Sequence, residues 1–396
     1  MKRSVLCAII AAGVISLCSS AMAKPLKVYI LAGQSNMEGH AKVATFDYMA
    51  LDPITAPILK EMRNADGTPR VCEKVWISYL HGAKTGDGGG EKHGKLTTGY
   101  GAQVNGPKIG PEFTFGIYMQ KLLDEPILII KTAWGGKSLH TDFRPPSAGA
   151  YKLNEYQMDL YAKQGKDIEK IKAEKVEASG RYYRLMIEYV KKVVKDIKQV
   201  YPDYDPQQGY ELAGFVWFQG WNDMCDARVY PDRKKPGGYD MYSELLAQFI
   251  RDVRKDLSAP KLPFVIGVMG VGGVKEEPNY FRQAMAAPAN LPEFKGNVVN
   301  VLTEKCWDAK LGELAGRWEK VRSKSSKLSK DKSLTLEQRT AAREKLIAEL
   351  YTPEELALYQ SGASNGNFHY LGSAKILAQI GKSFAEAMVE VRKQQN

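Results

Sequence analysis

The sequence predicts an α/β fold: a three-layer sandwich with helices on both faces of a five-stranded parallel sheet. Two observations lead to this prediction. Short apolar runs alternate with longer amphipathic segments, and each apolar run is followed by a glycine or a polar break. Such alternation is typical of parallel sheets, because each crossover connection places a helix on a face of the sheet. With 396 residues, 44% of them apolar, the chain can bury the core of one large domain.

Five apolar runs are the predicted strands, at residues 27–33, 126–134, 213–220, 263–270 and 298–304. The predicted helices are 111–123, 181–200, 241–257, 280–287 and 373–391. In the second helix, apolar residues recur at spacings of three and four and predict a buried stripe: Leu185, Met186, Tyr189, Val190, Val193, Val194 and Ile197. The repeated order of strand, helix and strand predicts right-handed crossovers.

Three stretches do not follow this alternation. Residues 82–110 contain ten glycines, which disfavour both helix and strand, and are expected to form a long irregular loop. Its GDGGG run lacks the strand, helix and Gly-Lys-Ser/Thr ending of a phosphate-binding loop. The second stretch, 144–180, is polar after RPPSAGAY. The third, 311–358, is charged and favours helix, which predicts a solvated helical insertion.

The first 23 residues have the pattern of an export signal. Lys2 and Arg3 precede a short apolar segment, and Ala21-Met22-Ala23 supplies small residues for cleavage. We therefore expect an exported protein, periplasmic or extracellular, with one domain over 24–396 and no membrane span, since no later segment is long enough. Cys72, Cys225 and Cys306 would remain, and the sequence does not indicate which of them pair.

The formal net charge of +11 leaves two interpretations open. A basic protein can bind acidic polymers, including nucleic acid. The lysine-rich stretch 311–358, however, carries ten Lys and Arg against eight Asp and Glu, as a solvated helical face does, and the chain has neither a recognition helix nor an aromatic-basic strand motif. We therefore predict a solvated basic face and no nucleic-acid partner.

Four clusters follow predicted strands or the helical insertion, where an open α/β sheet binds its ligands. They are Gly33 to Met37, Gly135 to Ser138, Gln219 to Asp223, and the loop SNGNFHYLGSAK with His369. Ser35 alone is equally a helix cap or a nucleophile. A serine nucleophile also needs a base and several donors for an oxyanion, and these clusters contain a candidate for each role.

The motifs GQSNM, GGKS and GWND, with the C-terminal histidine loop, resemble the SGNH hydrolase superfamily. Within it they are similar to the sialate O-acetylesterase-like and acetylxylan-esterase branch of carbohydrate esterases. The resemblance spans residues 33 to 369 and implies a flavodoxin-like sheet and removal of acetyl groups from carbohydrate hydroxyls, without a metal or cofactor.

The resemblance implies that Ser35 is the nucleophile and His369 the general base. The oxyanion donors would be the backbone N–H groups of Ser35 and Gly136 and the side chain of Asn222, with Gly135 as the alternative glycine. An unperturbed histidine titrates near pH 6.5, which would suit this cycle.

One position departs from the superfamily pattern. The usual aspartate, three residues before the histidine, is Gly366 here. Either a serine–histidine dyad suffices, with a backbone carbonyl orienting the ring, or another acid serves. Asp223 is the first candidate and Asp308 the second, and each is equally well explained as a structural residue.

Several polar and aromatic residues beside these motifs are candidates for substrate binding: Gln34, Lys137, Asp142, Arg144 and Trp221. The two cations could bind a carboxylate or sulfate of an acidic sugar, and the expected partner is an acetylated oligo- or polysaccharide. Two alternatives stay open. The protein could be a carbohydrate-binding protein that has lost catalysis, or an esterase for non-carbohydrate esters.

Overall fold

The computed structural model describes residues 24–82 and 90–395, so the predicted export signal lies outside the described part. A seven-stranded sheet has the order β4-β3-β6-β1-β7-β8-β9. Its strands are β1 (Leu26–Gly33), β3 (Val75–His81), β4 (Gly90–Lys95), β6 (Ile127–Ala133), β7 (Tyr210–Phe218), β8 (Phe264–Val268) and β9 (Val298–Leu302). All neighbours are parallel except β3 and β4, which are antiparallel.

The five predicted strands are confirmed, but the predicted number is wrong, because β3 and β4 were not expected. β3 has the aromatic and β-branched residues of a buried strand, so its signal was present in the sequence. β4 lies in the glycine-rich stretch expected to be a loop, and it pairs only with β3 at the edge of the sheet. A two-residue ladder of β2 (Ala41–Lys42) with β5 (Lys108–Ile109) lies outside the main sheet.

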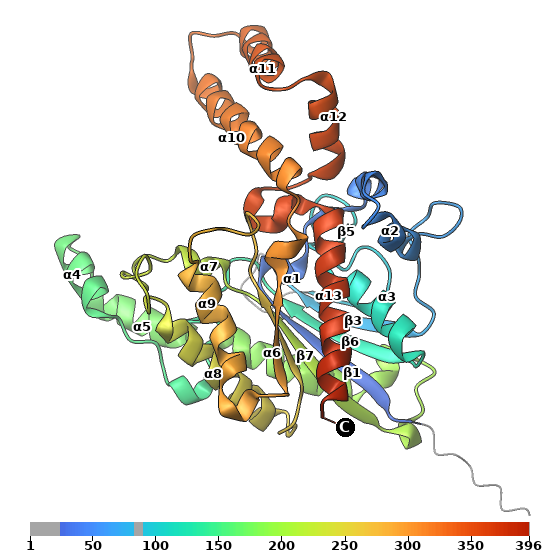
Figure 1. Cartoon of the computed structure of the whole chain (residues 1–396). Helices are drawn as coiled ribbons and strands as arrows, with labels where there is room; N and C mark the ends of the chain where they lie inside the picture. Colours follow the sequence, from blue (N-terminus) through green and yellow to red (C-terminus); the bar gives the residue numbers. More distant parts are fainter. Residues whose placement is uncertain (1–23, 83–89, 396) are drawn as a thin grey trace, which may run out of the picture.

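Helices cover both faces of the sheet, as predicted (Figure 1). On one face, α3 (Pro111–Leu123) packs against α13 (Ala374–Lys393). On the other lie α6 (Arg181–Lys195), α8 (Asp240–Asp256) and α9 (Tyr280–Ala286). The side chains of β7 alternate between these layers, since Trp217 packs on Phe249 of α8 and Phe218 on Phe384 of α13.

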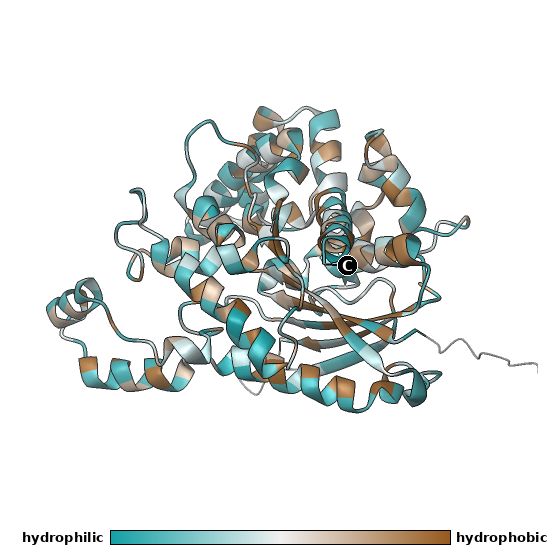
Figure 2. Ribbon diagram, turned by 60° about the horizontal axis from the view of Figure 1, so that its bottom comes forward, coloured by the Kyte–Doolittle hydropathy of each residue, from teal (hydrophilic) through white to brown (hydrophobic). Residues whose placement is uncertain are grey.

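The core follows from this layering. Figure 2 shows the central strands as largely hydrophobic, whereas the covering helices carry both hydrophobic and hydrophilic residues. In α6 the predicted stripe is mostly buried, and Leu185 and Val194 are partly buried at its border. Parallel strands covered on both faces need such continuous apolar runs.

Two groups of helices extend from the sandwich (Figure 1). The stretch predicted to be a charged insertion forms α10 (Ala309–Lys330), α11 (Leu336–Leu350) and α12 (Pro353–Gly362). This helical arm has a small apolar cluster of its own, built from Leu314, Val321, Leu346 and Tyr351. The second group is formed by the polar stretch 144–180, which contains α4 (Glu155–Lys163) and α5 (Ile168–Ala178). The remaining short helix, α2 (Ala56–Met62), belongs to neither group and lies near α3.

Two further predictions can be compared with the described part of the chain. Within residues 24–82 and 90–395, no helix is both long and apolar enough to cross a membrane. Cys72, Cys225 and Cys306 are free thiols, the first and last of them buried.

Candidate active site

Ser35 lies at a sharp turn from strand to helix. β1 ends at Gly33, where a Cβ atom would lie 2.1 Å from the carbonyl oxygen of Phe218, so only glycine fits. The short helix α1 (Ser35–Glu38) begins directly afterwards, with Gln34 as its N-cap. Ser35 is therefore not the cap that one interpretation expected. The first N–H groups of a helix have no intrahelical acceptor, and none is found for Ser35 or Asn36 among the described residues.

Gln34 orients the side chain of Asn222, which is the second residue of α7 (Trp221–Cys225). The Gln34 Oε1 atom accepts hydrogen bonds from the backbone N–H of Gly220 at 3.0 Å and from Gln219 Nε2 at 3.1 Å. The Gln34 Nε2 atom therefore faces the other way and donates to Asn222 Oδ1 at 3.0 Å. This leaves the amide Nδ2 of Asn222 as a donor with no acceptor in the described part of the chain.

Of the two adjacent glycines after β6, Gly135 donates its N–H in a hydrogen bond and Gly136 does not, among the described residues. A Cβ at Gly135 would lie 3.0 Å from Glu38 Oε2 and 3.8 Å from Ser35 Cβ, so this glycine lies beside both side chains. Burial raises the pKa of Glu38 to about 7, against the opposing effects of Lys131 and of a hydrogen bond from Gly135 N–H. Gly136 has φ +74° and open space around it. Its N–H, with no acceptor among the described residues, is the free donor.

His369 lies in a strained loop, η9 (Asn367–Gly372), that packs beside α1. Tyr370 and Leu371 are fully buried and have φ of 50° and 62°, a conformation that non-glycine residues rarely adopt. The Tyr370 hydroxyl accepts from Gly270 N–H at 2.8 Å and bonds Thr303 Oγ1 at 2.7 Å. These contacts with the ends of β8 and β9 hold the strained backbone in place.

Asn365 is the partner of the His369 ring. The Asn365 Oδ1 atom accepts from the backbone N–H of Gly366 at 2.7 Å, which identifies it as the amide oxygen. His369 Nδ1 lies 3.0 Å from the same oxygen and must therefore carry the proton. The lone pair is then on Nε2, as a general base requires. The acceptor at His369 Nδ1 is therefore a side-chain amide, and not the acid or the backbone carbonyl that the sequence suggested.

A second histidine supports the ring from its other side. The rings of His40 and His369 stack with their centroids 3.8 Å apart. Burial, the largest cause, and Lys108 lower the pKa of His369 to about 4. Burial, His369 and Lys108 lower the pKa of His40 to about 3. The expectation of an unperturbed histidine is therefore wrong, because the ring is buried, feels the charge of Lys108 and has no carboxylate partner among the described residues.

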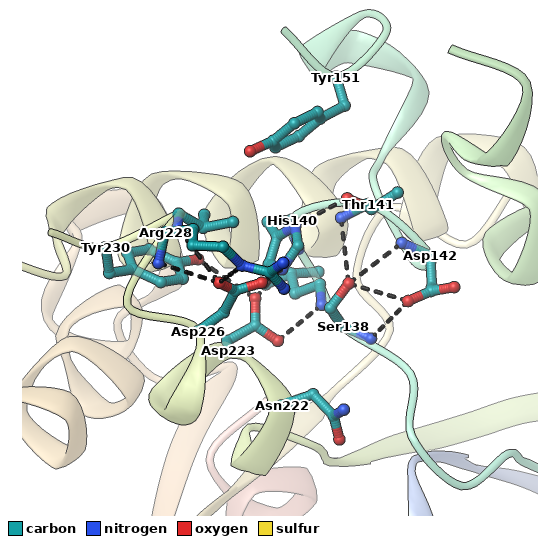
Figure 3. Close-up of polar contacts among 12 residues, drawn as sticks. Ser138, His140, Thr141, Asp142, Tyr151, Asn222, Asp223, Asp226, Arg228 and Tyr230 are labelled. Atoms are coloured by element: carbon teal, nitrogen blue, oxygen red, sulfur yellow. Dashed lines mark hydrogen bonds and ion pairs between the residues drawn. The ribbon is translucent and has the colours of Figure 1, made fainter. Parts of the chain in front are cut away.

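Asp223, the first candidate for the acid, has a structural role. Its carboxylate accepts from the backbone N–H groups of Leu139 at 2.8 Å and His140 at 3.1 Å. Gln219 and Tyr230 bind the same carboxylate. Figure 3 shows this carboxylate directed at the segment that carries Ser138 and His140, with the side chain of Asn222 lying apart from these contacts. Asp223 thus ties the glycine loop to α7.

Asp308, the second candidate, also binds elsewhere. Its Oδ1 caps α10 through the N–H of Leu311 at 2.8 Å. Its Oδ2 lies 2.7 Å from Lys375 Nζ and 2.9 Å from the Tyr48 hydroxyl. This carboxylate joins the helical arm to the core.

Most of the predicted substrate-binding residues have partners within the protein. Asp142 Oδ2 accepts from the N–H and the hydroxyl of Ser138 (Figure 3). Arg144 donates to the carbonyl oxygens of His140, Ala148 and Gly149. Gln34 is buried and positions Asn222.

Lys137 and Trp221 are more available to a ligand. Lys137 Nζ is 3.8 Å from Asp142 Oδ1 and lies over the Tyr182 ring. Trp221 is half-buried beside the exposed ring of Phe368, with their centroids 6.0 Å apart. Over the described ranges, no group of three or more His, Cys, Asp or Glu side chains could hold a metal ion.

Comparison with known proteins gives one family match. Residues 92–308, more than half of the chain, match the family described as carbohydrate esterase, sialic acid-specific acetylesterase. This range contains Gly136 and Asn222, whereas Ser35 and His369 lie outside it. No curated protein sequence matches the chain.

Two solved structures are similar to this chain at low identity. One is a protein from Arabidopsis thaliana, with 15% identity and a TM-score of 0.42, matched over 92% of this chain and 98% of that chain. The other is a carbohydrate acetylesterase from Xanthomonas citri, with 16% identity and a TM-score of 0.38, matched over 71% of this chain and 51% of that chain.

Proposed function

Because the chain belongs to the sialic acid-specific acetylesterase family of carbohydrate esterases, we propose that it removes O-acetyl groups from carbohydrates through an acyl-enzyme intermediate. Ser35 is the nucleophile of this proposal and His369 the base. Asn365 is the residue that orients the base. We also propose that the protein is exported, on the basis of the sequence pattern of residues 1–23.

The reaction has two steps. The Ser35 Oγ atom attacks the acetyl carbonyl carbon while His369 Nε2 takes its proton, and the sugar hydroxyl leaves with that proton. Water then attacks the acetyl-serine with the same base, releasing acetate and restoring Ser35. In both steps the negative oxygen is bound by the N–H groups of Ser35 and Gly136 and by Asn222 Nδ2.

One observation carries the proposal: the geometry leaves free donors and a base at one edge of the sheet. The N–H groups of Ser35 and Gly136 and the side-chain amide of Asn222 have no acceptors among the described residues. Asn365 in turn directs the lone pair of His369 to Nε2. Unpaired donors beside a buried serine are costly in a purely structural role and are what an oxyanion requires.

The direct test is Ser35→Ala. We expect the release of acetate from acetylated sugars and from p-nitrophenyl acetate to fall at least about 10⁴-fold, with an unchanged circular dichroism spectrum and Tm. Unchanged hydrolysis by the variant would show that Ser35 is not the nucleophile.

Two measurements separate the alternatives. A catalytically inactive carbohydrate-binding protein would bind glycans, and a serine-directed phosphonate would not label Ser35. An esterase for other substrates would prefer acyl chains much longer than acetate in a series of p-nitrophenyl esters. We expect phosphonate labelling and a preference for acetate.

A further inference from the structure

A cavity of about 660 Å³ lies beside the His369 loop and has no role in the reaction described above. Its walls are the segment 271–275 after β8, Glu304, Lys305 and Trp307 after β9, the first turns of α10, and Asn367. The cavity therefore lies between the carboxyl ends of β8 and β9, the start of the helical arm and the His369 loop. Its lining residue Asn367 is two residues before His369.

The order of the sheet gives the distance of this cavity from Ser35. β8 and β9 are the second and third strands from β1, and adjacent strands are about 4.8 Å apart. The cavity thus lies roughly 10–15 Å from the end of β1. Trp221 follows the intervening strand β7, and its ring lies beside that of Phe368, which is 38% exposed. Aromatic surface therefore lies between the candidate nucleophile and the cavity.

The charges of the cavity are unbalanced. Its two carboxylates are paired, because Glu304 binds Arg282 and Glu313 binds Lys310 and Arg317. Its two lysines, Lys275 and Lys305, are exposed and have no carboxylate partner in the described part of the chain. Among the charged side chains that line the cavity, those without an ion pair are therefore cationic, which favours an anion.

The cavity also has unused hydrogen-bonding groups. The Asn367 Oδ1 atom is buried and has no partner within residues 24–82 and 90–395, which is costly unless a ligand or water supplies a donor. The indole N–H of Trp307 has no acceptor among the described residues. A Cβ at position 312 would lie 2.7 Å from the Trp307 Nε1 atom, so Gly312 is what allows the indole ring to pack against α10 at the cavity wall.

We propose that this cavity is a subsite for an anionic sugar residue of the glycan chain, one or two units away from the acetylated sugar at Ser35. Lys275 and Lys305 bind its carboxylate or sulfate group, Asn367 Oδ1 accepts from a sugar hydroxyl, and the Trp307 N–H donates to a sugar oxygen. This inference rests on the proposed function, since it places the acetylated sugar at Ser35.

The subsite is tested by binding, which needs no catalysis. Calorimetry would use three tetrasaccharides without acetyl groups: a galacturonic acid oligomer, a sulfated galactan oligomer and neutral xylotetraose. We expect an anionic oligomer to bind more tightly than xylotetraose, and whichever of the two anionic probes binds more tightly identifies the charged group. In the K275Q/K305Q variant its Kd should rise about tenfold.

The matched control removes the same charge from another part of the protein. Lys320 and Lys324 are exposed on α10 and do not line the cavity, so the K320Q/K324Q variant should keep both wild-type binding and wild-type hydrolysis of p-nitrophenyl acetate. Equal binding of all three probes, or equal losses in both double variants, would overturn the subsite. Binding by a wild-type protein that hydrolyses no acetate ester would instead contradict the proposed function and leave the subsite standing.

Discussion

At the scale of single residues, Asn365 takes the place that an acid has in most serine–histidine sites. Its amide oxygen accepts from His369 Nδ1 and so selects the tautomer that a base needs. An amide supplies a dipole rather than a full negative charge, so it stabilises the imidazolium less than a carboxylate does. In the proposed mechanism, Asn365 thus keeps the orientation of the base, while the basicity of the His369 ring is low.

The pH profile of the reaction should show this low basicity. The pKa of His369 is lowered to about 4 by burial and by Lys108. Since only the neutral ring can act as base, kcat/KM should fall as the pH decreases through about 4, and not through the usual 6.5. The measurement is kcat/KM for p-nitrophenyl acetate between pH 3.5 and 8, after correction for the stability of the enzyme and of the ester.

Asn365→Asp is the informative variant for the same residue. A carboxylate at Nδ1 favours the imidazolium, so the acid limb should move about 1–3 pH units higher. Asn365→Ala removes the acceptor, and kcat should fall about 10- to 100-fold with a smaller change in KM. An acid limb that stays in the same place in Asn365→Asp would show that Asn365 does not contact the catalytic ring.

The candidate site was only partly predictable from the sequence. Ser35, Gly136, Asn222 and His369 were identified by motifs. In the structure the first three follow β1, β6 and β7 closely, and His369 lies in η9, which packs beside α1. Asn365 was missed because the usual pattern has an acid three residues before the histidine, whereas this amide is four residues before it. Tyr370 and Leu371, which have left-handed backbone conformations, turn the loop so that the amide four residues before His369 contacts its ring. No sequence rule predicts that conformation at bulky residues.

At the scale of elements, Asp308 shows how the helical arm is joined to the sandwich. Its carboxylate caps α10 and pairs with Lys375 of α13, and the side chains of this pair are 6% and 15% exposed. Lys375 also pairs with Asp52 at 2.8 Å, so its charge is held by two carboxylates. Removing one partner of a largely buried charge-assisted hydrogen bond destabilises a protein.

Asp308→Asn should therefore reduce stability without changing the chemistry. The variant keeps an oxygen for the cap but loses the ion pair with Lys375. Because Lys375 keeps its second partner, Asp52 at 2.8 Å, we expect a cost of about 2 kcal/mol of unfolding free energy. Chemical denaturation would measure this loss, and kcat for p-nitrophenyl acetate should stay unchanged. The control, Asp331→Asn, alters an exposed carboxylate that bonds only Ser333 among the described residues, and should leave the Tm as it is. A large loss of kcat in Asp308→Asn would restore its role as the acid.

The elements themselves were mostly predictable, because amphipathic periodicity and apolar runs are local signals. α3 has the predicted bounds, and the five predicted strands are present. β4 was not predictable, since its sequence GEKHGK has no buried apolar residue and it is a strand only because it pairs with β3.

At the scale of the whole molecule, the buried histidines and Glu38 have opposite effects on acid stability. Burial lowers the pKa of His40 to about 3 and that of His369 to about 4, and it also lowers the pKa of His140. These rings bind protons more readily in the unfolded chain, so each removes stability as the pH falls below about 6.5. Glu38 binds its proton more readily in the folded protein, because its pKa is raised from 4.5 to about 7. It therefore adds stability as the pH falls from about 7 to 4.5.

Two substitutions should consequently change the acid slope in opposite directions. Each proton taken up on unfolding changes the unfolding free energy by at most about 1.4 kcal/mol per pH unit. The wild-type Tm should fall between pH 6.5 and 4.5, because three histidines outweigh the two buried carboxyl groups whose pKa is raised, Glu38 and Glu112. Glu38→Gln removes one opposing group and should make this fall steeper, whereas His40→Gln removes one histidine and should make it shallower. Calorimetric Tm values at half-unit pH steps, each referred to that variant's own value at pH 7.5, would test this. Parallel curves for the three proteins would show that these buried groups do not set the acid stability of the fold.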